Sequence, residues 1–189
     1  MIEEMEREMD IAYPSPREIC MDYVIREAAE ADAALMASLI REAFADVAVR
    51  FGLTPENSPR HPSNCTPHWI RSAFTKGVRH FLLETPEGPA GCVALESANA
   101  DVCYLERLAV LPAYRRNGFG EALVSHAAER AQALGARRVE LGMVAPQTEL
   151  REWYERLGFS VTTIVRFEGT RFEVAFMRKD LEAPTPTSG

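Results

Sequence analysis

The sequence has no apolar run long enough to span a bilayer, and its first ten residues are acidic where a secretory signal would be basic and then apolar. Membrane insertion is therefore not expected, and the cytoplasm is the expected compartment. Internal repeats and low-complexity blocks are also lacking. A chain of 189 residues is long enough for one domain with a full core and too short for two ordinary ones, so one domain is expected.

The sequence also lacks paired cysteines and an excess of basic residues. Its four cysteines are scattered, without the close spacing of a disulfide framework or a four-thiolate zinc site, so reduced thiols are expected. The formal charge is −7, from 21 Lys and Arg against 28 Asp and Glu. Nucleic-acid binding draws most of its affinity from cations on phosphates, so no nucleic-acid partner is expected. The acidity suits a cationic substrate or simply serves solubility.

No metal site is expected either. His61, Cys65 and His68 are residue types that bind zinc, but they lie in or beside the proline-rich segment 52–67 and have no obvious fourth ligand. The prolines predict a long loop there. Long loops in compact domains are often functional, so this loop, with the helix expected after it, is a candidate wall of a substrate pocket.

Periodicity and turn residues predict an α/β (α+β) domain over residues 21–182, with an N-terminal extension at 1–20 and a flexible tail at 183–189. The expected order is strand, helix, a short helix, three strands, helix, strand, helix and a closing hairpin. The expected helices are 28–49, 68–75, 118–134 and 148–157. The expected strands are 22–26, 80–84, 90–96, 102–110, 137–144, 159–167 and 171–178, with the hairpin turn at 168–170.

Residues 115–120, Arg-Arg-Asn-Gly-Phe-Gly, follow a strand and open a helix. Backbone N–H groups at such a helix start have no intrahelical partner, and the helix dipole adds positive potential there, so the turn is suited to phosphate. Gly118 and Gly120 permit close approach, and Arg115 and Arg116 add charged donors. The alternative is an ordinary loop with strain-relieving glycines and solvated arginines. A dinucleotide-binding turn is disfavoured, since Leu123 replaces the third glycine.

Residues 105–120, Leu-Glu-Arg-Leu-Ala-Val-Leu-Pro-Ala-Tyr-Arg-Arg-Asn-Gly-Phe-Gly, resemble the signature of the GNAT superfamily of N-acetyltransferases. Residues 153–159, Trp-Tyr-Glu-Arg-Leu-Gly-Phe, are similar to the same family's later motif. The resemblance covers roughly residues 22–180. It implies a mixed, mostly antiparallel central sheet flanked by helices. It also implies direct transfer of an acetyl group from the cosubstrate acetyl-CoA to a primary amine of a small molecule or peptide, in a ternary complex without metal.

The resemblance also implies where the cosubstrate binds. The pantetheine arm would lie along the backbone of Leu108, Ala109 and Val110, and the Val110 N–H would polarise the thioester carbonyl. Gln147 stands seven residues before Tyr154, where the family often has asparagine, so its contact with the arm is open. The pyrophosphate would lie on Arg115, Arg116, Asn117, Gly118, Phe119 and Gly120.

Two side chains are candidates for the chemistry. Tyr154 matches the family tyrosine that protonates the departing thiolate, a role that suits a phenol of pKa about 10; otherwise it is an aromatic packed on the sheet. Glu106 is the candidate base, because strand parity puts it on the same side as Leu108 and Val110 unless a bulge intervenes. The alternative for Glu106 is an ion pair with Arg107 that does nothing catalytic.

Three further questions stay open at this level. A non-catalytic acyl-CoA sensor would keep the turn at 115–120 and leave Tyr154 and Glu106 unused. Transfer to a hydroxyl, or of a longer acyl chain, would use the same residues. Homodimers are common in the family that the motifs resemble, and no residue here identifies an interface.

Overall fold

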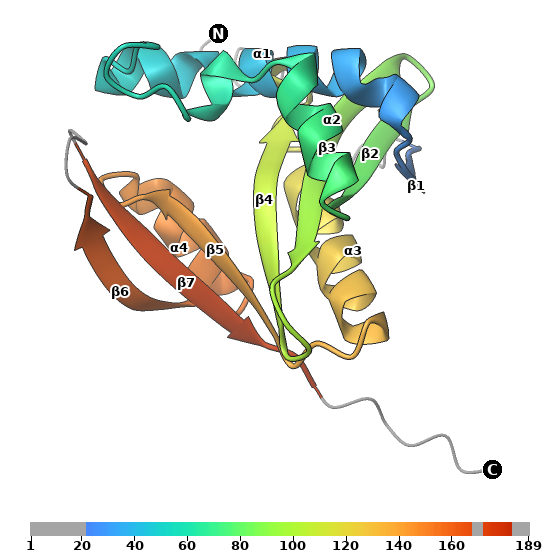
Figure 1. Ribbon diagram of the computed structural model, residues 1–189, viewed down its shortest axis with the longest axis vertical. Helices are drawn as coiled ribbons and strands as arrows, with labels where there is room; N and C mark the ends of the chain where they lie inside the picture. Colours follow the sequence, from blue (N-terminus) through green and yellow to red (C-terminus); the bar gives the residue numbers. More distant parts are fainter. Residues whose placement is uncertain (1–21, 168–171, 183–189) are drawn as a thin grey trace, which may run out of the picture.

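The computed structural model describes residues 22–167 and 172–182, and within them seven strands form one sheet in the order β1-β2-β3-β4-β5-β7-β6 (Figure 1). The strands are β1 Val24–Glu27, β2 Arg79–Thr85, β3 Gly88–Ser97, β4 Val102–Val110, β5 Arg138–Val144, β6 Ser160–Arg166 and β7 Glu173–Asp180. All neighbours are antiparallel except β4 and β5, which are parallel. The expected mixed, mostly antiparallel sheet is confirmed.

Four α-helices flank this sheet within the described residues, and their order matches the expected one. They are α1 Ala33–Phe51, α2 Pro67–Thr75, α3 Phe119–Ala133 and α4 Thr148–Arg156, with short 3-10 turns η1 Glu30–Asp32, η2 Pro62–Asn64 and η3 Pro112–Tyr114. The first helix begins five residues later than expected, since η1 precedes it. The expected extension at 1–20, the hairpin turn at 168–170 and the tail at 183–189 lie outside the described residues.

The sheet separates two apolar layers. Under α3 and α4, the larger layer holds side chains of β2 to β5 and β7 together with Leu123, Val124 and Tyr154. Under α1 and α2, the other layer holds Met36, Ile40 and other side chains. Because neighbouring residues of a strand point to opposite faces, each central strand contributes to both layers. Residues of β4 can therefore reach both sides of the sheet.

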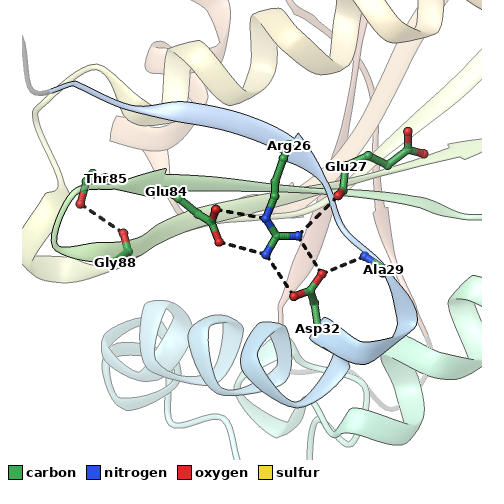
Figure 2. A network of polar contacts seen from close by, with 7 residues as sticks. All are labelled: Arg26, Glu27, Ala29, Asp32, Glu84, Thr85 and Gly88. Carbon is green, nitrogen blue, oxygen red and sulfur yellow. Dashed lines mark hydrogen bonds and ion pairs between the residues drawn. The ribbon is translucent and has the colours of Figure 1, made fainter.

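An ion-pair network fastens the first strand to the start of α1 (Figure 2). The Arg26 guanidinium on β1 donates to both carboxylate oxygens of Glu84 on β2 and to both of Asp32, at 2.8 to 3.1 Å. Asp32 also accepts from the Ala29 backbone N–H, and hydrogen bonds from Arg26 hold the Asp32 pKa below its usual value. This contact fixes where α1 begins over the sheet.

No helix in the described part of the chain is long and apolar enough to cross a bilayer.

Candidate active site

The two parallel strands at the centre of the sheet separate along their length. They pair only at Val102 with Arg138, Cys103 with Val139 and Tyr104 with Glu140, yet β4 continues to Val110 and β5 to Val144. Figure 1 shows β4 and β5 diverging beyond this point. Among the described strands, β4 has from residue 105 onward a neighbour on one side only, β3. Its other edge is available to an extended ligand that adds to the sheet like a strand.

A β-bulge interrupts β4 at the start of this free edge. The pairing with β3 moves from Ala94 with Glu106 to Cys92 with Ala109, so two residues of β4 face one of β3, and Arg107 has a φ of 50°. The bulge reverses the parity of the strand. Ala109 consequently packs under α1, while Leu108 and Val110 pack on the α3 side.

The expectation that Glu106 shares a face with Leu108 and Val110 is therefore wrong. Glu106 precedes the bulge and is directed to the opposite face, where it lines a pocket with side chains of α2. Glu106 still belongs to the part of β4 that has no pairing with β5. The site thus combines the Glu106 carboxylate, on the α2 face of the sheet, with the free backbone edge of β4.

The turn after β4 presents a run of unpaired backbone amides. Within the described part of the chain, none of the N–H groups of residues 116–121 donates a hydrogen bond, and the first bond of α3 runs from Ala122 to the Gly118 carbonyl. The helix that starts here has 15 residues. Its dipole adds positive potential at these amides, which suits an anion.

The polar side chains of the turn make different contacts. The Arg115 guanidinium is turned toward α1, where it donates to the Ala43 carbonyl at 2.7 Å and pairs with Asp46 at 2.5 Å. Asn117 donates to the Tyr114 carbonyl. Arg116, with a φ of 67°, is exposed. The expected pair of arginines is thus split: Arg115 tethers the turn, and Arg116 is positioned at the surface beside the amides.

Glycine is favoured at the two positions of the turn, 118 and 120, for different reasons. Gly118 precedes α3 with a φ of 78°, and a Cβ there would meet nothing within 4 Å, so conformation alone favours glycine. A Cβ on Gly120 would lie 3.2 Å from the Trp153 ring, so this glycine lets α3 approach α4. Between them, Phe119 is buried in the core and contacts the rings of Tyr23 and Tyr114, which anchors the helix start.

Tyr154 is buried on α4, at 6% exposure, where its ring contacts Trp153 and Phe159. Burial raises the pKa of its phenol above the ordinary value, so it is protonated at neutral pH. Among the described residues, no hydrogen bond engages its hydroxyl. Gln147, the other candidate of this region, is the residue before α4 and makes no side-chain cap to the helix.

A pocket of about 510 Å³ opens on the α2 side of β3 and β4. The two carboxylates of its lining, Glu96 and Glu106, lie on the same sheet face, because Glu106 pairs with Ala94 two residues before Glu96. The rest of the lining is mostly polar or basic, with one indole. It includes Arg60, His68, Trp69, Ser72, Lys76 and Arg107.

Only part of this pocket was expected from the sequence. The helix after the proline-rich loop is an expected wall, and it supplies His68, Trp69, Ser72 and Ala73 to the lining. Arg107 is expected only as an ion-pair partner of Glu106, and the two side chains do pair, at 3.0 Å. Glu96 is not expected from the sequence. Glu96 ends an expected strand, and its parity with the other buried residues of that strand was the one signal that could have directed it here.

The three candidate metal ligands, His61, Cys65 and His68, differ in their surroundings. The His61 ring is buried and hydrogen-bonded to Ser63, and burial lowers its pKa. Cys65 is fully buried, with its pKa raised by burial, whereas His68 lines the pocket. In residues 22–167 and 172–182, no three His, Cys, Asp or Glu side chains are grouped so as to hold a metal ion.

The model of the acetyltransferase (GNAT) family matches residues 48–159, more than half of the chain. The ribosomal protein bS18-alanine N-acetyltransferase of Escherichia coli K12 is 30% identical over 101 residues, which are 52% of this chain and 68% of that protein. An amino-acid acetyltransferase of Neisseria meningitidis is 30% identical over 106 residues, 55% of this chain. The chain spans only 23% of the length of that second relative.

Solved structures with the same fold have lower sequence identity. The ribosomal-protein-S18-alanine N-acetyltransferase from Escherichia coli superposes with a TM-score of 0.70 at 19% identity, covering 89% of this chain and 99% of that one. A GNAT family acetyltransferase from Elizabethkingia anophelis, with acetyl-CoA bound, gives a TM-score of 0.63 at 14% identity, covering 84% and 98%. These structures share the mixed α/β fold of this chain.

Proposed function

This chain belongs to the acetyltransferase (GNAT) family, and we propose that it transfers an acetyl group from acetyl-CoA to a primary amine of a small molecule or peptide. One observation carries the proposal. The free edge of β4 leads directly into a turn whose amides, from residue 116 to 121, are unpaired. An extended arm on the edge and a diphosphate on the turn are the two halves of coenzyme A, in the right order along one strand.

In this proposal the backbone does most of the cosubstrate binding. The arm lies along Leu108, Ala109 and Val110, with Gln147 on the other side of the opening. The pyrophosphate takes hydrogen bonds from the amides of the turn, and Arg116 adds charge. Arg115 holds the turn against α1 instead of contacting the phosphates, which is the role that its bonds to Asp46 and Ala43 support.

The chemistry is a direct acyl transfer within a ternary complex. The amine nitrogen attacks the thioester carbonyl carbon, a C–N bond forms and the C–S bond breaks. Glu106, or a water that it holds, takes the proton that the ammonium loses, and Tyr154 gives a proton to the departing thiolate. The Val110 N–H stabilises the oxyanion. None of these steps requires a metal ion.

The experiment that tests this function measures coenzyme A binding and thiol release with a matched pair of variants. Gly118→Val and Gly135→Val both place a β-branched residue at a positive φ, 78° and 88°, and neither Cβ would meet an atom within 4 Å. Both substitutions carry the strain of the left-handed conformation, roughly 1–2 kcal/mol in the folded state. They flank the two ends of α3, and only Gly118 adjoins the unpaired amides.

We expect wild type to bind coenzyme A and release thiol with an amine. Gly118→Val is expected to weaken coenzyme A binding at least tenfold, and Gly135→Val less than twofold, as measured by calorimetry. Equal losses in both variants would show that strain, not the turn, sets the affinity. Binding by wild type without thiol release for any amine would favour an acyl-CoA sensor.

A further inference from the structure

The pocket under α2 contains charges of both signs at its inner wall. Glu106 and Arg107 are adjacent on β4, and Glu96 lies on the same sheet face as Glu106. At about 510 Å³, the pocket has the size of sites for small organic ligands. A ligand of one charge would leave half of this wall unmatched. The wall is complementary to a molecule that carries a cation and an anion close together.

Arg107 is the cation at this wall whose hydrogen bonds are incomplete. Its side chain is 24% exposed, and its buried Nη1 lies 3.0 Å from a Glu106 oxygen as an ion pair but forms no hydrogen bond. A buried guanidinium donor without an acceptor is costly. Arg60 and Lys76 also line the pocket, but both are exposed to solvent.

Among the described residues, Arg107 forms no second ion pair. His80 is fully buried nearby, and burial, followed by the charge of Arg107, lowers its pKa to about 4, so it is neutral. The Cys92 thiol is also neutral, because burial raises its pKa to about 12. Arg107 thus has one carboxylate partner, Glu106, and Nη1 forms an ion pair with it without a hydrogen bond.

A zwitterionic ligand would satisfy the charges of both Glu106 and Arg107. Its ammonium would replace the guanidinium at Glu106, and its carboxylate would accept two parallel hydrogen bonds from Arg107. The exchange keeps the charge of the wall balanced. Because Glu106 and Arg107 directly precede the free edge at 108–110, the amine would be delivered beside the thioester that the proposed function places there.

We propose that the acceptor is a free amino acid, or a similar amine with a carboxylate a few bonds away, and that Arg107 binds that carboxylate. This inference rests on the proposed function and adds the substrate class. A peptide N-terminus, whose amine is followed by a neutral amide, lacks the group that Arg107 would bind. Arg107 has a left-handed backbone conformation at the bulge, with a φ of 50°, and its side chain lines this wall.

The test compares each amino acid with its own carboxamide and its aminophosphonate, in a thiol-release assay at saturating acetyl-CoA. For wild type we expect kcat/KM at least tenfold higher for the acid than for the carboxamide. In Arg107→Gln this ratio is expected to fall close to one, through a rise in KM for the acid, and Arg107→Lys should restore part of it. Arg71→Gln, an exposed cation on α2 outside the pocket lining, is the matched control.

Each outcome bears on the inference. Equal use of acids and carboxamides by wild type, or an unchanged ratio in Arg107→Gln, overturns it and leaves the acetyltransferase proposal intact. A preference for phosphonates over carboxylates keeps Arg107 as the anion site and replaces the amino acid with a phosphonate. Coenzyme A binding is measured in parallel, so a failure of the donor site, which would sink the proposed function itself, is recognised separately.

Discussion

The turn after β4 and the pocket under α2 are built from different parts of the same chain. The turn offers backbone amides, and the side chains around it mostly hold it in place, as Arg115 does through Asp46. The pocket offers side chains of both charges, brought from α2, β3 and β4. Backbone amides bind any phosphate of the right shape, whereas side chains can be exchanged without altering the fold.

The difference indicates how one strand, β4, can contribute both to the binding site for the acetyl donor and to the binding site for the amine acceptor. The bulge at Arg107 divides β4 into a part whose charged side chains face the pocket and a part whose backbone edge is free. Substitutions in the first part should change which amine is used. Substitutions in the turn should change affinity for the donor with every amine.

The largest expected effect separates chemistry from both binding regions. If Tyr154 protonates the thiolate, Tyr154→Phe should lower kcat by roughly 10²-fold or more, because one positioned proton donor is lost. The dissociation constant of coenzyme A and the KM of the amine should change less than twofold. Steady-state kinetics and calorimetry measure these three quantities. Tyr23→Phe, which removes a phenol hydroxyl but keeps the ring that contacts Phe119, is the control. A normal kcat in Tyr154→Phe would assign Tyr154 to packing alone.

The order of the elements and the position of the turn could be predicted because their signals are local. Apolar periodicity, prolines and glycines act within a few residues of where they stand, so α3, α4 and the strand before the turn fall within a residue or two of their expected bounds. The mixed, mostly antiparallel character of the sheet followed from the family resemblance. Gly118 could be recognised for the same reason, since its positive φ is a local property.

The rest depends on contacts that no local pattern encodes. The bulge after Glu106 places Leu108 and Val110 on the opposite face of the sheet from Glu106. Alternation along one strand cannot reveal such an extra residue without the pairing partner. Arg115 is tethered by Asp46, 69 residues away, and Gly120 faces Trp153 of α4. The pocket joins residues from 60 to 107, so its charge balance emerges only when α2 lies on the sheet.

A smaller effect tests whether Gly120 belongs to the turn or to the core. A Cβ 3.2 Å from the Trp153 ring must displace it, so Gly120→Ala should destabilise the fold by about 1 kcal/mol. In a Trp153→Leu background the added cost should disappear, a coupling that urea unfolding of the four proteins measures. If coenzyme A affinity falls equally in both backgrounds, the ligand, and not α4, requires the glycine.

The smallest expected effect concerns the tether between the turn and α1. The ion pair of Arg115 and Asp46 is largely exposed, at 39% and 55%, so Asp46→Asn should cost at most about 0.5–1 kcal/mol at neutral pH. Hydrogen bonds from Arg115 lower the Asp46 pKa in the folded state. The unfolded chain therefore binds this proton more readily, and the contribution is present above the ordinary Asp pKa and is lost as pH falls through the folded value.

Unfolding free energies at pH 7 and near pH 3 measure this difference, and Glu42→Gln, an exposed carboxylate on the same helix, is the control. The gap between wild type and Asp46→Asn should narrow at the lower pH, while Glu42→Gln should match wild type at both. The same variant also sharpens the contrast between the two regions. If Arg115 only holds the turn, coenzyme A affinity should fall slightly when Asp46 is lost. A rise in affinity would mean that the freed guanidinium reaches the phosphates, so that a side chain, and not only the backbone, can bind the donor.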